Sequence, residues 1–93
     1  MTVKQHIINY MKHLMNSNKA TFETSDIQNL SERSTKFVPS GRLGSPGTYE
    51  RMFRTLRESG MIQVKKYKRF KKQKQSSWYL ENIGDENGKN KRT

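Results

Sequence analysis

The segment from Ser45 to Gly60 constrains the fold most, because both ends of a helix can be recognised in it. Ser45 is a favourable N-cap, Pro46 suits the first helical turn, and Gly60 supplies a stop. A helix is therefore predicted over about 46–59. Its apolar residues recur at helical spacing and fall on one face, which must pack against a core. These core-facing residues are Tyr49, Met52, Phe53 and Leu56.

The opposite face of this helix is expected to be polar and basic. It carries Arg51, Arg54, Thr55 and Glu58, with Gly47 and Thr48 one turn earlier. Gly47 lacks a side chain where the first N–H groups of the helix point outward, so an anion can approach closely. Arg57 is expected on a flank nearer the core, where it can meet a phosphate or an acidic neighbour.

Three earlier segments are predicted to share the core with this helix. Residues 2–17 show the apolar spacing of an amphipathic helix, whereas 19–24 is typical of a short strand anchored by Phe22. A second helix is expected to begin near residue 25, where Ser25 and Gln28 can form a capping box. The stripe of the first helix is Val3, Ile7, Ile8, Met11, Leu14 and Met15. Phe37 and Val38 are expected to fasten the loop before the third helix to the core.

A hairpin is predicted after Gly60. Ile62 and Val64 alternate with polar residues in its first strand, and Trp78 and Leu80 do so in its second. Between the strands, seven of the ten residues from 65 to 74 are basic. Lysines can protect a strand edge from unwanted pairing, but this density exceeds that need and favours contact with a nucleic acid.

The positive charge of the chain is concentrated in one segment. Residues 33–74 hold 13 Lys and Arg against two Glu, which equals the formal net charge of +11 for the whole chain. The remaining residues hold six basic and six acidic groups, which cancel. Such a concentrated field attracts a polyanion and steers its approach.

Several function classes are disfavoured by composition. The 93 residues suffice for one small domain, and the absence of cysteine excludes disulfides and thiolate-bound metals. His6 and His13 lack further ligands nearby in the sequence, so no metal or cofactor is expected. A nuclease or other enzyme is disfavoured because the basic segment has no clustered carboxylates. No apolar run approaches a membrane span or a signal peptide, and an intracellular location in the cytoplasm or nucleoid is expected.

The order of helix, short strand, helix, loop, helix and hairpin resembles the winged-helix variant of the helix-turn-helix fold. The sequence SPGTYERMFRTLRESG is similar to its recognition helix, and MIQVKKYKRFKKQKQSSWYL is similar to its wing. The connection between the second and third helices is longer than the tight turn of a simple helix-turn-helix. The resemblance implies an α+β winged-helix domain of three helices and a two- to three-stranded antiparallel sheet over residues 1–83. Residues 84–93 are expected to form a disordered polar tail or linker.

The resemblance further implies that the third helix enters the major groove of double-stranded DNA and that the wing, about 65–75, follows the backbone or a minor groove. Arg51 is the leading candidate for reading a base, because arginine can donate two parallel hydrogen bonds to guanine. Arg54 can read a base or bind a phosphate. The predicted DNA-binding residues are Arg42, Ser45, Gly47, Thr48, Arg51, Arg54, Thr55, Arg57, Lys66, Lys68, Arg69, Lys71, Lys72 and Lys74.

The biological role stays open between transcription regulation and recognition of a replication origin. An RNA-binding or ribosome-associated protein is the alternative, because Tyr67, Phe70 and Tyr79 could stack on unpaired bases. The oligomeric state is also open: the domain could belong to a longer protein or form a weak dimer.

Overall fold

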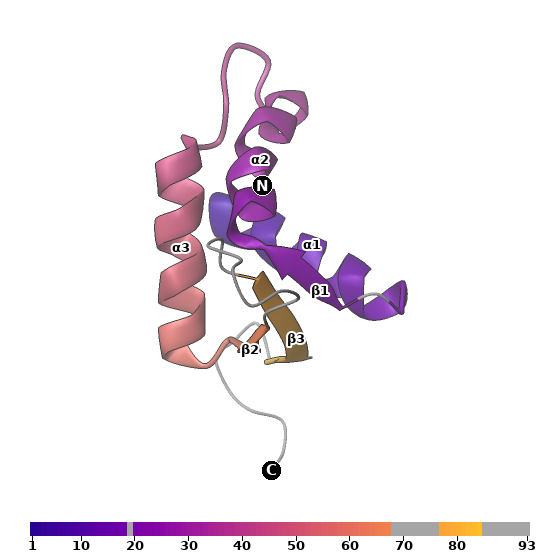
Figure 1. Ribbon diagram of the computed structural model, residues 1–93. Helices are drawn as coiled ribbons and strands as arrows, with labels where there is room; N and C mark the ends of the chain where they lie inside the picture. Colours follow the sequence, from indigo (N-terminus) through magenta and orange to yellow (C-terminus); the bar gives the residue numbers. More distant parts are fainter. Residues whose placement is uncertain (19, 68–76, 85–93) are drawn as a thin grey trace.

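The computed structural model describes residues 1–18, 20–67 and 77–84 (Figure 1). These residues form a small α+β domain with three α-helices, a short 3-10 helix and a three-stranded antiparallel sheet. In chain order the elements are α1 (Val3–Asn16), β1 (Thr21–Glu23), α2 (Thr24–Arg33), η1 (Ser34–Phe37), α3 (Pro46–Ser59), β2 (Ile62–Tyr67) and β3 (Ser77–Ile83). The predicted α+β class and the predicted helix over 46–59 are confirmed.

The sheet has the strand order β1-β3-β2, so β3 lies in the centre. The β2 and β3 strands pair as the predicted hairpin, with Lys66 opposite Trp78 and a bulge between Gln63 and Val64. The short β1 strand adds to the other edge of β3, where Phe22 lies opposite Trp78. The N-terminal part of the chain is thereby joined to the hairpin.

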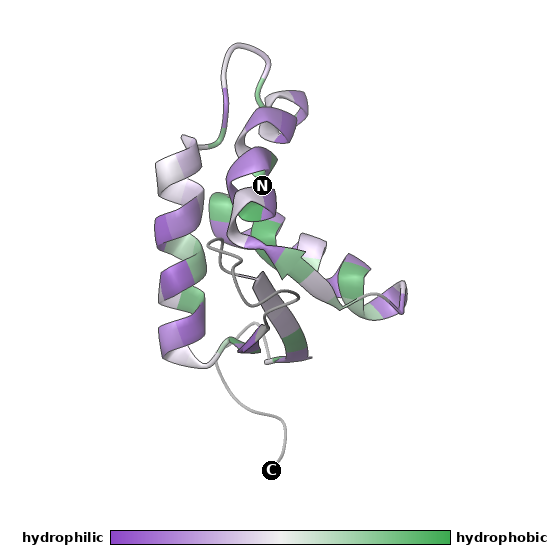
Figure 2. Cartoon of the chain, in the orientation of Figure 1, coloured by the Kyte–Doolittle hydropathy of each residue, from purple (hydrophilic) through white to green (hydrophobic). Residues whose placement is uncertain are grey.

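The core lies between the sheet and the three helices. Figure 2 shows hydrophobic colour on the side of α3 turned toward α2 and the sheet. Aromatic rings form a continuous edge-to-face series through this core, from Tyr10 to Phe22, Phe53 and Trp78, with centroids 5.5 to 6.4 Å apart. From α1, the residues Ile7, Ile8, Met11 and Leu14 of the predicted apolar stripe are buried in this core. Met15 was expected in this stripe but is 42% exposed, because it lies in the last turn of α1, past the buried set.

The start of α2 differs from the sequence prediction. The helix begins at Thr24, directly after β1, and Glu23 is its N-cap. The capping box is formed by Glu23 and Asp26, and the backbone N–H of Glu23 donates to Asp26 Oδ2 at 2.9 Å. The predicted box of Ser25 and Gln28 was therefore wrong by two residues, because the strand continues into the helix without a loop.

The connection from η1 to α3 is fastened by buried serines. Ser34 Oγ donates to the carbonyl oxygen of Ser31 at 2.6 Å and accepts from the backbone N–H of Leu43 at 2.9 Å. Ser31 Oγ donates to the carbonyl oxygen of Gly44 at 2.6 Å. Both serine side chains are fully buried, whereas Phe37 is 39% exposed and packs edge-on against a histidine ring. The expectation that Phe37 anchors this loop in the core was wrong, because small hydroxyl groups satisfy the backbone of the loop from inside.

Candidate nucleic-acid interface

The orientation of α3 is set by its caps and its buried face. Ser45 Oγ accepts from the backbone N–H of Thr48 at 3.1 Å, and Gly60 ends the helix in the left-handed region at φ 82°. Tyr49, Phe53 and Leu56 are at most 2% exposed. A helix fixed in this way can present its outer face to a ligand without rotating.

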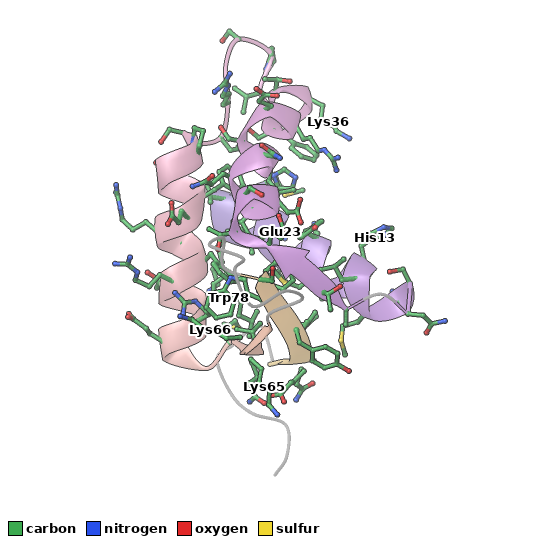
Figure 3. All side chains as sticks on the ribbon, in the orientation of Figure 1. His13, Glu23, Lys36, Lys65, Lys66 and Trp78 are labelled. Atoms are coloured by element: carbon green, nitrogen blue, oxygen red, sulfur yellow. The ribbon has the colours of Figure 1, made fainter. Side chains whose placement is uncertain are left out.

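The outer face carries the side chains that were predicted to contact DNA. Arg51, Arg54 and Thr55 are exposed, and neither arginine forms an ion pair with another described residue. Figure 3 shows nitrogen-tipped side chains on this side of α3 pointing away from the rest of the molecule. The hydroxyl of Thr55 donates to the carbonyl oxygen of Arg51 at 3.1 Å. Thr55 can therefore accept hydrogen bonds from a ligand more readily than it can donate them.

The first turn of α3 is capped by side-chain hydroxyl groups, and its backbone is accessible beside Gly47. The hydroxyl groups of Ser45 and Thr48 are 3.0 Å apart, so both take part in the cap. Gly47 is exposed, and a Cβ added there would meet only Ser45 Oγ, at 3.9 Å. An anion could reach this turn beside Gly47 without meeting a bulky side chain. Arg42 is exposed in the loop that precedes α3, and Figure 1 shows this loop at the end of the molecule away from the β2 and β3 strands.

Two of the predicted residues, Arg57 and Lys66, gather at a tryptophan. The guanidinium carbon of Arg57 lies 4.5 Å from the centre of the Trp78 ring and 5.0 Å from that of Phe53. Lys66 Nζ lies 5.9 Å from the Trp78 ring. Figure 3 shows Lys66 and Trp78 close together beside the C-terminal half of α3.

These side chains line a cavity of about 220 Å³, which we name the Trp78 pocket. Its lining residues are Thr24, Glu50, Phe53, Arg54, Arg57, Lys66 and Trp78. The indole Nε1 of Trp78 donates to Thr24 Oγ1 at 3.0 Å, which fixes the ring plane. Sequence reasoning missed Trp78 as a site residue and assigned it only to the second strand of the hairpin. Its pairing with Lys66 depends on the register of the hairpin, for which the sequence carries no local signal.

Most of the predicted wing residues lie outside the described part of the chain. These residues are Lys68, Arg69, Lys71, Lys72 and Lys74. The predicted tail also lies outside the described part from residue 85 onward. At the described base of the hairpin, Lys65 Nζ lies 3.3 Å from Glu81 Oε2, and both side chains are largely exposed. This exposed pair is worth little energetically, so it competes only weakly with a ligand for Lys65.

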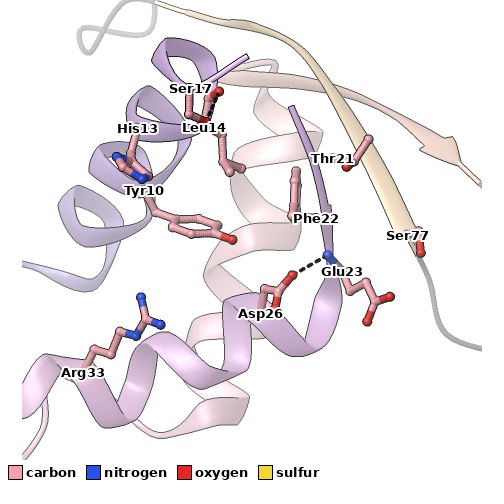
Figure 4. Close-up of a pocket in the computed structure, with 10 residues that line it drawn as sticks. All are labelled: Tyr10, His13, Leu14, Ser17, Thr21, Phe22, Glu23, Asp26, Arg33 and Ser77. Carbon is pink, nitrogen blue, oxygen red and sulfur yellow. Dashed lines mark hydrogen bonds between the residues drawn. The ribbon is translucent and has the colours of Figure 1, made fainter. Parts of the chain in front are cut away.

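A larger groove of about 560 Å³ lies between α1, β1 and α2 (Figure 4). Its charged side chains are mixed in sign and include Glu23, Asp26 and Arg33. The two acidic residues form the cap of α2, as the dashed line from Glu23 to Asp26 in Figure 4 indicates. This groove therefore lacks the single sign of charge that attracts a polyanion.

Histidine, aspartate and glutamate side chains in the described part of the chain do not form groups that could hold a metal ion. His6 is buried, and its Nδ1 lies 2.6 Å from the hydroxyl oxygen of Tyr49. Burial lowers the pKa of His6, and the nearby charges of Lys36 and Arg33 lower it further. This histidine connects α1 with α3 as a neutral hydrogen-bonding group.

Within residues 1–18, 20–67 and 77–84, no helix has the length and apolar character required to cross a membrane. Comparison of the chain with protein-family models, curated proteins and solved structures finds no match.

Proposed function

We propose that the protein binds double-stranded DNA in a sequence-specific manner, with α3 in the major groove. The observation that carries this proposal is the outer face of α3, where Arg51 and Arg54 are exposed on a helix whose other face is locked in the core. A helix of 14 residues is about 21 Å long, and the major groove, about 12 Å wide, accepts such a helix. Arg51 reads a guanine, and Arg54 reads a base or binds a phosphate.

The arrangement of the elements supports a winged-helix reading of this proposal. The order of α1, β1, α2, α3 and the β2 and β3 hairpin, with β1 added to the sheet, resembles that of winged-helix domains. In such an arrangement the hairpin follows the DNA backbone next to α3. The 13 basic residues of 33–74 include Arg51, Arg54 and Arg57 of α3, and this concentration of charge supports electrostatic attraction to phosphates. Regulation of a promoter and recognition of a replication origin both require this activity.

Selection of bound sequences from a random duplex library tests the proposal. Enrichment of one motif is expected, and binding of the selected duplex is then compared with binding of a random duplex at fixed salt. Arg51→Ala should cost about 1 to 3 kcal/mol on the selected site and much less on random duplex, since a bidentate contact to guanine is lost. Arg51→Lys should restore part of the charge but little of the discrimination, because an ammonium group lacks the planar pair of donors.

Thermal unfolding provides the control for these variants. Arg51 is exposed and does not belong to the hydrophobic core, so its replacement should leave Tm nearly unchanged. Equal losses on selected and random DNA would make Arg51 a phosphate contact and shift base reading to Thr48, Arg54 and Thr55. Failure to enrich any duplex motif would overturn the proposal.

RNA binding is the second candidate and has one observation in its favour. Tyr79 is 47% exposed on the central strand, and an exposed aromatic ring can stack on an unpaired base. Competition between the selected duplex and single-stranded RNA separates the two candidates. Tighter binding to RNA, weakened by Tyr79→Ala and not by Arg51→Ala, would favour this second function.

A further inference from the structure

The Trp78 pocket has the features of a preformed anion site. It brings together Arg54 and Arg57 from α3 and Lys66 from β2, against one carboxylate, that of Glu50. Gln28 Nε2 donates to Glu50 Oε1 at 2.8 Å, so one oxygen of this carboxylate is already engaged on the α2 side. Within the described residues Glu50 forms no ion pair with either arginine. The pocket therefore keeps a net positive charge.

Arg57 is held rigidly at this site. Its guanidinium group lies against two aromatic rings, and one of them, Trp78, is fixed in turn by its hydrogen bond to Thr24. Its Nε is buried and has no hydrogen-bond partner among the described residues. Buried donors of this kind are normally paired. Because Nε is closed off, the rest of the guanidinium, held against the two rings, is the part that can meet a ligand in the pocket, and its planar N–H groups match the oxygens of a phosphate.

The size of the pocket limits the ligand. Sites for small organic molecules measure about 300 to 1,000 Å³, and the Trp78 pocket, with about 220 Å³, is smaller. It is therefore small for an organic ligand, whereas a single phosphate group with some water would fit. Arg54 lines the pocket and is also exposed on the outer face of α3, so the pocket adjoins the proposed base-reading surface.

We infer that the Trp78 pocket binds one backbone phosphate of the duplex that α3 reads, with Arg57 as the central donor and Arg54 and Lys66 beside it. This inference rests on the proposed DNA binding and assigns to it a fixed contact between α3 and the hairpin. Such a contact sets the depth and register of α3 in the groove without reading sequence. Arg57 thus contributes to the binding of every duplex, in contrast to Arg51.

Single neutral methylphosphonate substitutions, placed in turn at each phosphate of a selected duplex, test the inference. For the wild-type protein, the substitution at the phosphate held by the pocket should lower affinity by about tenfold or more, as expected for loss of a charge-assisted contact. Arg57→Met keeps an unbranched apolar side chain against Trp78 but removes the donors. In this variant affinity should fall by about tenfold for selected and random duplexes alike, and the sensitive position should become insensitive.

Two further variants keep the test independent of folding. Arg57→Lys retains the charge without the planar donors and should recover only part of the affinity. Arg33→Met removes a comparable charge from the groove on the other side of α2 and should change affinity by less than about twofold. Far-UV circular dichroism and thermal unfolding establish that each variant is folded.

The outcomes separate this inference from the proposed function. If wild-type protein selects a duplex motif but Arg57→Met binds like wild type, Arg57 is a structural stack and the inference is overturned while DNA binding stands. If no duplex is bound, the fluorescence of Trp78, the only tryptophan, is measured with inorganic phosphate and with chloride at matched ionic strength. A phosphate-specific change that Arg57→Met abolishes would keep the anion site and reject DNA as its source. No such change would reject both.

Discussion

Replacement of Ser34 by alanine should destabilise the domain far more than its small change in volume suggests. The Ser34 side chain is fully buried, donates to the Ser31 carbonyl and accepts from the Leu43 backbone N–H. The variant loses both hydrogen bonds, at about 1 kcal/mol each, and leaves the Leu43 N–H without this partner in a site of low water access, whereas the Ser31 carbonyl keeps the backbone N–H of Ser34. The expected decrease in the free energy of unfolding is therefore about 2 to 3 kcal/mol, which for a domain of this size lowers Tm by about 8 to 24 °C.

Thr35→Ala is the matched control for this prediction. Thr35 lies next to Ser34 in η1, and its hydroxyl also donates to a carbonyl three residues earlier, that of Glu32. This bond is exposed, so water replaces it and the expected cost is at most about 0.5 kcal/mol. Urea unfolding followed by Trp78 fluorescence measures both variants in one assay. Equal midpoints for the two would refute the conclusion that buried serines fasten the loop before α3.

The same loop offers a second comparison. Phe37→Ala removes a large but partly exposed ring, whose known neighbours are His6 and Lys36. Its effect on the free energy of unfolding should be smaller than that of Ser34→Ala, although far more apolar surface is deleted. A larger effect for Phe37→Ala would restore the sequence-based view that this ring anchors the loop.

Three further predictions concern salt, pH and the end of α3. Neutralisation of about six phosphates should give a slope near −5 in a plot of log K against log salt, and a slope shallower than about −2 would contradict backbone binding. Because folding lowers the pKa of His6 below 6.5, its contribution to the free energy of unfolding should be fully present above pH 6.5 and should be lost as the pH falls below that value. His6→Gln should remove this contribution to the pH dependence, which urea titrations at several pH values measure. Gly60→Ala should lower the free energy of unfolding by about 1 kcal/mol, since φ is +82° there, whereas Gly41→Ala, in open space, should be nearly neutral in thermal unfolding.

Local signals in the sequence determine much of this protein. Both boundaries of the helix over Pro46–Ser59 could be predicted, because the N-cap, the proline and the terminal glycine each affect only the backbone of the few residues next to them. Alternation of apolar and polar residues predicted the hairpin, and the outer face of α3 followed from helical periodicity alone. The concentration of positive charge in residues 33–74 is likewise a property of the sequence.

Other features depend on contacts between distant parts of the chain, and only the tertiary structure decided them. The capping box of α2 includes Glu23, not the predicted Ser25, because β1 pairs with β3, more than fifty residues later, and continues directly into the helix. Ser31 and Ser34 became the anchors of the loop because the fold buries them beside backbone groups of Leu43 and Gly44.

The Trp78 pocket is the clearest case of this kind. Arg57 and Trp78 are far apart in sequence, and they meet only when α3 packs on the sheet and the hairpin register sets Lys66 opposite Trp78. Helical periodicity placed Arg57 near the edge of the core but could not supply its aromatic partner. A side chain's direction is set locally by its own element, whereas its neighbours are set by the packing of elements that are remote in the chain.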